Sequence, residues 1–263
     1  MLGAIIGDIV GSAYEFNNYR ATNFSPFFHP ECFFTDDTVC TVAVADALLH
    51  DSDPAIELKN WGRRYWENGG WGGRFAQWLA GPSIEPYYSY GNGAAMRVSP
   101  AGLLAESLED AIRLANQVTA VTHNHPEGMK GAAATATAIY LARQKVSPAV
   151  ISQRIEACFA YDLSATVDEI RPHYRFNETC QETVPQALIC ALSADSYEQA
   201  IRNAISIGGD SDTIAAIAGG LAEALFGIPE PIATQGLCYL PPDMRRIVGL
   251  LYQRAGGSIT CQP

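Results

Sequence analysis

The stretch Gly131-Ala-Ala-Ala-Thr-Ala-Thr-Ala138 and the segment from Ala215 to Ala224, which contains Gly219 and Gly220, decide the fold class. Small side chains allow helix axes to approach closely, so such runs predict central helices that are buried on all sides. His125-Pro126 provides a helix start for the first run, and Gly227 followed by Ile228-Pro229 provides a stop for the second.

Further start and stop signals predict helices along the rest of the chain. Asp53-Pro54 has the form of an N-cap followed by proline, and Ser107-Leu-Glu-Asp110 resembles a capping box. No stretch alternates strictly between apolar and polar residues, so we expect no sheet. The prediction is an all-α, compact multi-helix bundle with buried central helices, in one domain covering 1–263. Helices are expected at 54–68, 107–121, 126–145, 148–160, 182–194, 197–206, 213–226 and 241–254, with 81–100 irregular.

Composition narrows the class of protein. The chain has 28 acidic and 17 basic side chains, a formal net charge of −11, which disfavours nucleic acid or an anionic membrane as partner. The apolar N-terminus, Met1 to Ala13, is too short to cross a bilayer and lacks the flanks of a signal peptide. We expect a cytoplasmic monomer whose dispersed cysteines are reduced thiols. These cysteines are Cys32, Cys40, Cys158, Cys180, Cys190, Cys238 and Cys261.

Two acidic clusters stand where helices are expected to begin. Thr35-Asp36-Asp37-Thr38 precedes an apolar run, and Gly208-Gly209-Asp210-Ser211-Asp212-Thr213 precedes the helix expected at 213–226. Helix capping explains one short acceptor at each start, but not two carboxylates at both. Together they form an all-oxygen donor set, which suits Mg²⁺, Mn²⁺ or Ca²⁺ rather than zinc or copper. If the clusters meet in space, they can form a two-metal centre.

The N-terminal segment has a glycine at every fourth position: Gly3, Gly7 and Gly11. This spacing predicts a flat helix face for close packing. Asp8 and Glu15 lie seven residues apart, so we expect them to share another face of the same helix. A lone glutamate at a helix end is usually solvated, whereas the apolar surroundings favour an interior position for Glu15.

Two further motifs are weaker. In Gly91-Asn92-Gly93-Ala94-Ala95-Met96-Arg97 the glycines fit a tight turn, or a loop whose N–H groups face a diphosphate. Arg97 fits either a phosphate contact or an internal salt bridge. In Thr122-His123-Asn124-His125 no third soft ligand is near, which excludes zinc. His123 fits a buried imidazole, or a hydrogen-bonding partner of a ligand.

Taken in order, these motifs resemble those of the ADP-ribosylglycohydrolase family, which includes dinitrogenase reductase-activating glycohydrolase. The resemblance carries Gly7-Asp8, Gly11 and Glu15, both Asp clusters, the loop from Gly91 to Arg97, and Thr122-His123. It implies an all-α bundle that binds two Mg²⁺, or Mn²⁺, and a hydrolase that releases ADP-ribose by cleaving the glycosidic bond at the anomeric carbon.

The resemblance also implies roles for individual residues. The implied catalytic residues are Glu15, Asp36 and Asp212. The implied metal ligands are Thr35, Asp36, Asp37, Asp210, Asp212 and Thr213. The implied substrate-binding residues are Gly91, Asn92, Gly93, Ala95, Met96 and His123.

The sequence departs from the nitrogenase-linked member before the glycine loop. In that member an acidic residue stands just ahead of the loop, whereas here Tyr87-Tyr88-Ser89-Tyr90 precede Gly91. This departure counts against an arginine-specific mechanism of the kind found in that member. The linkage (arginine, serine or O-acetyl) stays open, as does the choice of base among the carboxylates. The substrate is expected to be an ADP-ribosylated protein side chain. The alternatives are a small ADP-ribose conjugate and a non-catalytic, crystallin-type structural relative.

Overall fold

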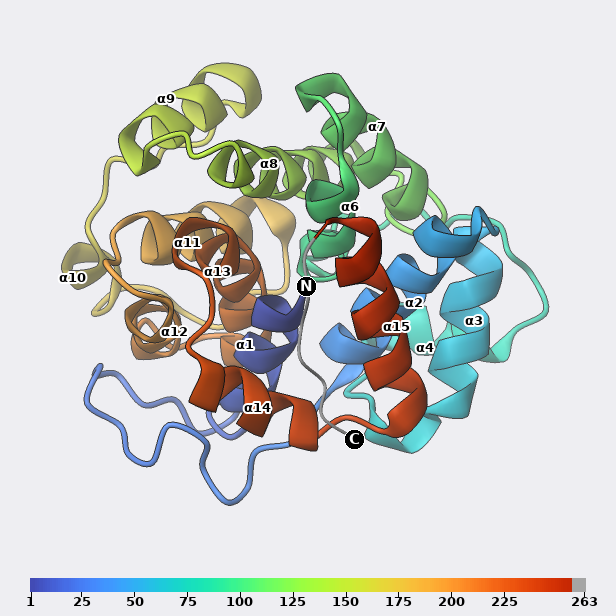
Figure 1. Ribbon diagram of the computed structural model, residues 1–263, viewed down its shortest axis with the longest axis horizontal. Helices are drawn as coiled ribbons and strands as arrows, with labels where there is room; N and C mark the ends of the chain where they lie inside the picture. The colour runs from blue at the N-terminus through green and yellow to red at the C-terminus, as the bar shows by residue number, and fades with distance from the viewer. Residues whose placement is uncertain (257–263) are drawn as a thin grey trace.

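The computed structural model describes residues 1–256, and its regular structure is helical (Figure 1). Within these residues no strand forms, and a single isolated β-bridge joins Gly91 to Thr179. The predicted all-α class is confirmed. The helices are α1 (Leu2–Ser12), α2 (Asp36–His50), α3 (Pro54–Arg64), α4 (Gly73–Ala80), α5 (Gly93–Met96), α6 (Ser99–Leu104), α7 (Leu108–Thr119), α8 (Pro126–Arg143), α9 (Pro148–Phe159), α10 (Val167–Ile170), α11 (Cys180–Leu192), α12 (Tyr197–Ser206), α13 (Ser211–Phe226), α14 (Glu230–Cys238) and α15 (Pro242–Arg254), with a 3-10 turn η1 (Trp66–Asn68).

The centre of the molecule is the antiparallel pair α1 and α13, which the glycine stripe brings into backbone contact. A Cβ atom at Gly3 would lie 2.4 Å from the carbonyl oxygen of Gly219, and one at Gly7 would lie 2.0 Å from that of Ala215. At Gly11 it would lie 2.5 Å from the Cα of Asp212. The predicted close packing is therefore present, and it places the C-terminal end of α1 beside the acidic start of α13.

Around this pair the small-residue run on α8 forms a second contact layer. Residues 131–138 are all buried, and α8 packs on α13, α11, α7 and α6. A Cβ at Gly131 would lie 2.7 Å from the Sγ of Cys180 on α11. Figure 1 shows α8 lying across α11 and α13. The prediction that helices with small residues are central is correct.

Most predicted helices are present with small shifts, but five features were predicted wrongly or missed. The helix expected at 54–68 ends at Arg64, and η1 follows it. The region 81–100, expected to be irregular, contains α5 and the start of α6. Helices α4 and α10 are only 8 and 4 residues long, too short for a clear periodic pattern. Helix α14 was missed because Pro229 and Pro231 bracket its start, and prolines after Gly227 indicate a loop.

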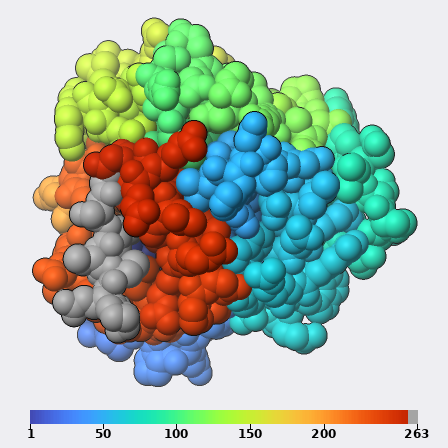
Figure 2. Space-filling view, turned by 45° about the vertical axis from the view of Figure 1, so that its right-hand side comes forward, coloured from blue at the N-terminus to red at the C-terminus, as the bar shows by residue number. Residues whose placement is uncertain are grey.

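The last described helix closes the bundle against the first third of the chain. Figure 2 shows α15 beside the segment that holds α2 and α3, and the Asp243 carboxylate accepts a hydrogen bond from Tyr65 at 2.6 Å and pairs with Arg64 at 3.0 Å. Six cysteines in the described residues are unpaired, as expected, and Cys261 lies outside those residues. None of the described helices is both long and apolar enough to span a membrane.

Candidate active site

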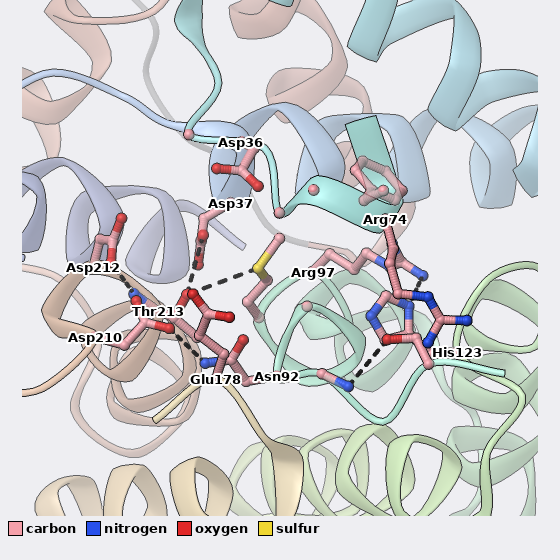
Figure 3. Close-up of a pocket in the computed structure, with 18 of the residues that line it drawn as sticks. Asp36, Asp37, Arg74, Asn92, Arg97, His123, Glu178, Asp210, Asp212 and Thr213 are labelled. Carbon is pink, nitrogen blue, oxygen red and sulfur yellow. Dashed lines mark hydrogen bonds between the residues drawn. The ribbon is translucent and has the colours of Figure 1, made fainter. Parts of the chain in front are cut away.

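A cavity of about 250 Å³ opens where the starts of α2 and α13 meet the Gly91 loop and the start of α4. Figure 3 shows carboxylates at one end and two arginines with His123 at the other. We call these the acidic end (Glu15, Asp36, Asp37, Asp210, Asp212) and the basic end (Arg74, Arg97, His123). The other lining residues are Gly70, Gly72, Gly73, Phe75, Tyr87, Ser89, Gly91, Asn92, Gly93, Met96, Glu178 and Thr213.

At the start of α2, the helix is capped without the acidic side chains of Asp36 and Asp37. Thr35 caps the helix by accepting a hydrogen bond from the N–H of Asp37 at 3.3 Å. Asp8, fully buried on α1, accepts hydrogen bonds from the N–H and hydroxyl of Thr35 at 2.9 and 2.7 Å and from both groups of Thr38. Asp8 thus fixes the start of α2, and neither Asp36 nor Asp37 is needed as the cap.

Among the described residues, no side chain caps the start of α13. Asp210 occupies the N-cap position, but its carboxylate accepts a hydrogen bond from Nδ2 of Asn92 at 2.6 Å instead. The hydroxyl of Thr213 donates to Oδ2 of Asp37 at 3.2 Å, which joins the two acidic clusters directly. The clusters lie far apart in sequence and meet in the fold, as the metal-centre hypothesis requires.

The carboxylates of the acidic end are not neutralised by basic side chains. Burial, together with the neighbouring carboxylates, raises the pKa of Asp36 to about 7 and of Asp37 well above its ordinary value. Burial raises the pKa of Asp212 well above its ordinary range, and Asp210 and Asp37 add to the effect. No described lysine, arginine or histidine forms an ion pair with any of the five. This arrangement favours a bound cation.

The donor set fits a hard divalent cation. Carboxylate oxygens of Glu15, Asp210 and Asp212 lie within 4.8 Å of one another, close enough to hold one ion together. Oδ1 of Asp37 is buried and has no hydrogen-bond partner in the described residues. A buried anionic oxygen without a partner is costly unless a ligand satisfies it. The oxygen-only chemistry suits Mg²⁺ or Mn²⁺.

Glu15 reaches the acidic end from a loop, not from a helix. The expectation that it shares a helix face with Asp8 is wrong, because α1 ends at Ser12 and Tyr14 turns into an aromatic cluster with Phe24. Glu15 is half-buried, as the interior interpretation favoured, and burial followed by the charge of Asp210 raises its pKa to about 7. The side chain of Asn18 holds this loop: Nδ2 donates to the carbonyls of Tyr14, Glu15 and Gly209, at 2.8, 3.0 and 3.0 Å.

At the basic end, Arg97 determines the tautomer of His123. Arg97 is 1% exposed and donates from the same nitrogen to Oγ1 of Thr122 at 2.5 Å and to Nδ1 of His123 at 3.3 Å. Since a guanidinium can only donate, Nδ1 is the acceptor and Nε2 carries the proton. Nε2 faces the backbone of Gly91 and Gly93. Burial, with Arg97 and Arg74 nearby, lowers the pKa of His123 well below its ordinary value, so the ring is neutral.

Most of the predicted substrate-binding residues line the cavity, but two predicted site residues do not. Gly91, Asn92, Gly93, Met96 and His123 are lining residues. Ala95 is buried behind them. Thr35 is also buried, and its hydroxyl is used by Asp8. Within the part of the chain that the structure describes, neither Arg97 nor Arg74 forms a salt bridge.

Sequence reasoning missed one complete wall of the cavity. The segment Gly69-Gly70-Trp71-Gly72-Gly73-Arg74 leads into α4, and a Cβ at Gly72 or Gly73 would meet nothing within 4 Å. Four glycines in five residues, followed by an arginine and a helix, were the available signal. Glu178 was also missed, because only its pairing with the glycine loop, through its carbonyl and the N–H of Asn92 at 2.7 Å, brings it to the cavity.

Comparison with known proteins places this geometry in a family. A family model described as ADP-ribosylglycohydrolase matches residues 1–257. The chain belongs to the ADP-ribosylglycohydrolase family. It is 26% identical to ADP-ribosylhydrolase ARH3 of Mus musculus, over 90% of this chain and 86% of that protein. It is also 26% identical to ADP-ribosylarginine hydrolase Tri1 of Pseudomonas putida (strain GB-1), over 87% of this chain and 70% of that one.

A solved structure supports the same fold. An ADP-ribosylglycohydrolase-related protein complex superposes with a TM-score of 0.71 at 23% identity, and the match covers 97% of each chain. The sequence-based family resemblance and the all-α ADP-ribosylglycohydrolase fold are confirmed. The relatives named ADP-ribosylhydrolases also confirm the prediction of a glycohydrolase enzyme.

Proposed function

We propose that this ADP-ribosylglycohydrolase removes ADP-ribose from a modified protein side chain by hydrolysis and depends on two Mg²⁺ ions, which Mn²⁺ can replace. One observation carries the proposal: five carboxylates that have no basic partner in residues 1–256 converge at one end of a cavity, and the arginines at its other end have no carboxylate partner in the same residues. Such a cavity matches a substrate whose sugar lies beside the bound cation and whose phosphates lie at the arginines.

The acidic end provides the ligands for the metal ions. Asp36, Asp37, Asp210, Asp212 and Thr213 supply oxygen atoms from two helix starts, and Thr35 lies behind them as the cap of α2. When bound, the ions would supply a Lewis acid and would neutralise the mutual repulsion of the carboxylates. Asp8 keeps the start of α2 in place through its four hydrogen bonds.

The rest of the cavity binds the ADP portion. Gly70, Gly72 and Gly73 leave backbone accessible along one wall, and Arg74 follows them at the start of α4. Exposed N–H groups and a guanidinium favour phosphate oxygens. Nε2–H of His123 supplies a neutral donor beside Gly91 and Gly93, where a charged imidazolium is disfavoured by burial and by Arg97.

Proton transfer is assigned to the carboxylates nearest the metal ligands. Glu15 is half-buried, whereas Asp212 is buried, and Glu15 lines the cavity, so its carboxylate can exchange protons with water. A carboxylate with a pKa near neutrality can act as both acid and base in a hydrolysis. We assign Glu15 this role, and Asp36 and Asp212 the role of orienting the attacking water and the ribose.

The test is release of ADP-ribose from defined substrates. ADP-ribosylated arginine peptide, ADP-ribosylated serine peptide and O-acetyl-ADP-ribose are each incubated with the enzyme, with Mg²⁺ and with EDTA. The proposal expects release from at least one peptide that requires the divalent cation. Release from O-acetyl-ADP-ribose alone would move the function to small conjugates, and equal release in EDTA would contradict the metal assignment.

A further inference from the structure

The side chain of Asn92 contacts a carboxylate of the acidic end (Figure 3). Its Nδ2 donates a hydrogen bond to Oδ2 of Asp210 at 2.6 Å, and both residues are 6% exposed. Asp210 occupies the N-cap position of α13, where an aspartate usually accepts hydrogen bonds from N–H groups of the first turn. Here the carboxylate is turned toward Asn92 instead, so this bond sets its direction.

The amide of Asn92 uses both of its hydrogens, and this fixes its orientation. Nδ2 also donates to Oγ1 of Thr183 at 3.3 Å, and that hydroxyl donates its own hydrogen to the carbonyl of Asn177 at 3.1 Å. Thr183 is fully buried on α11. A rotated amide would place its oxygen against the Asp210 carboxylate and against a hydroxyl whose hydrogen is already used. The hydrogen-bond directions therefore keep the donor on Asp210.

Backbone hydrogen bonds hold Asn92 in place on both sides. The N–H of Asn92 donates to the carbonyl of Glu178 at 2.7 Å, and the carbonyl of Tyr90 accepts from the N–H of Cys180 at 3.0 Å. The carbonyl of Asn92 accepts the first hydrogen bonds of α5, at 2.8 and 3.1 Å. The loop that carries Asn92 is thus anchored to the segment that leads into α11, and its amide reaches Asp210 from a fixed position.

We propose that Asn92 is a positioning residue for Asp210: it holds this carboxylate in the direction that binds the metal ion. The inference rests on the proposed function, in which Asp210 is a metal ligand. Carboxylates that bind a metal are usually hydrogen-bonded by a neighbouring group, and losing that group typically lowers metal affinity or activity by 10- to 100-fold. The sequence predicted Asn92 as a substrate-binding residue, and this inference gives it a different role.

The two roles of Asn92 differ in what a substitution changes. A residue that only contacts the substrate acts on KM and leaves the affinity for the metal ion unchanged. A residue that positions Asp210 acts first on the affinity for the ion. In that case the rate falls at limiting Mg²⁺, and much of it should return when Mg²⁺ is saturating.

The experiment is a calorimetric titration of EDTA-stripped protein with Mg²⁺ alone, for the wild type, Asn92→Leu and Asn92→Ala. Leucine has a similar size but no donor, and alanine carries the same test if the leucine variant does not fold. We expect the Kd for Mg²⁺ to rise about ten-fold or more in both variants. Thr183→Val should raise the Kd less, because Thr183 orients the amide of Asn92 and does not contact Asp210 through a printed hydrogen bond.

Asn203→Ala is the matched control. Asn203 is also 6% exposed, and its Nδ2 donates to the carbonyl of Cys190 at 3.1 Å, so this variant loses a buried amide that serves the backbone. Its melting temperature should fall while its Kd for Mg²⁺ stays unchanged. An unchanged Kd in the Asn92 variants, or an equal rise in Asn203→Ala, would overturn the inference. A wild-type protein that binds no Mg²⁺ would instead overturn the metal site of the proposed function.

Discussion

The two ends of the cavity hold opposite charges, and they hold them differently. At the acidic end, buried carboxylates such as Asp37 and Asp212 face one another, and burial keeps their pKa values high. At the basic end, Arg97 is buried against the neutral acceptors Thr122 and His123, while Arg74 is exposed and donates to the carbonyl of Tyr87. At the acidic end like charges lie close together, whereas the arginines of the basic end donate hydrogen bonds to neutral groups.

This difference implies that the acidic end needs a bound cation before the substrate arrives, whereas the basic end receives its counter-charge from the substrate. Like charges at close range in a buried site are costly, so the acidic end is incomplete without a cation. Both guanidinium groups of the basic end donate hydrogen bonds to neutral groups, while Nε of Arg97 is buried with no partner among the described residues. Changes at the acidic end should therefore act on catalysis and metal binding, and changes at the basic end on substrate affinity.

The largest effect is expected for Asp212→Asn, which keeps size but removes an anionic donor. The rate of ADP-ribose release should fall by about 100-fold or more, because loss of a metal ligand removes several kcal/mol of transition-state stabilisation. Stability in EDTA should hold or increase, because one like charge has left the cluster. Steady-state kinetics at limiting Mg²⁺ and a melting curve in EDTA measure both. A fully active variant would remove Asp212 from the site.

A smaller effect of a different kind is expected for Arg74→Gln. Arg74 is exposed and pairs with no carboxylate of the described residues, so the melting temperature should change little. Losing a charged donor to phosphate should raise KM about ten-fold with kcat nearly unchanged. Comparing KM and kcat with those of Asp212→Asn tests the contrast directly. A drop in kcat without a change in KM would place Arg74 in the chemical step instead.

The smallest effect is a pH trend in stability without metal. The pKa values of Asp8, Glu15 and Asp36 are raised to about 6, 7 and 7, above the ordinary carboxyl range. The folded state then holds these protons more tightly than the unfolded chain, so stability must fall as pH rises from about 4 through about 7. In EDTA the melting temperature should decrease by several degrees between pH 5 and 8. Saturating Mg²⁺ should remove that decrease, and a rise with pH in EDTA would contradict the electrostatic account.

The sequence predicted the core of the fold because that core follows local rules. Glycine at every fourth position gives the face of α1 that contacts α13, and small residues identify the buried helices. The carboxylates that meet belong to the starts of two helices, and the motifs at Asp36 and Asp210 mark those starts in the sequence. Short helices such as α10 lacked enough turns to show a period, and prolines concealed α14.

The parts of the site that escaped prediction depend on contacts between distant segments. The helical period suggested a shared face for Asp8 and Glu15, but Tyr14 packs on Phe24 and the chain has left the helix before Glu15. Glu178 reaches the cavity only because its segment pairs with the Gly91 loop. The glycines before Arg74 resemble an ordinary turn until α4 and α2 are placed together.

The most direct test of the metal centre is a calorimetric titration of EDTA-stripped, re-purified protein with Mg²⁺, run beside the rate of ADP-ribose release at each concentration. We expect saturable binding, with a rate that rises in proportion to occupancy and is restored fully from the stripped state. The Asp212→Asn variant should show weakened binding in the same titration. Full activity of the stripped enzyme without measurable uptake of a divalent cation would contradict a catalytic metal site at the starts of α2 and α13.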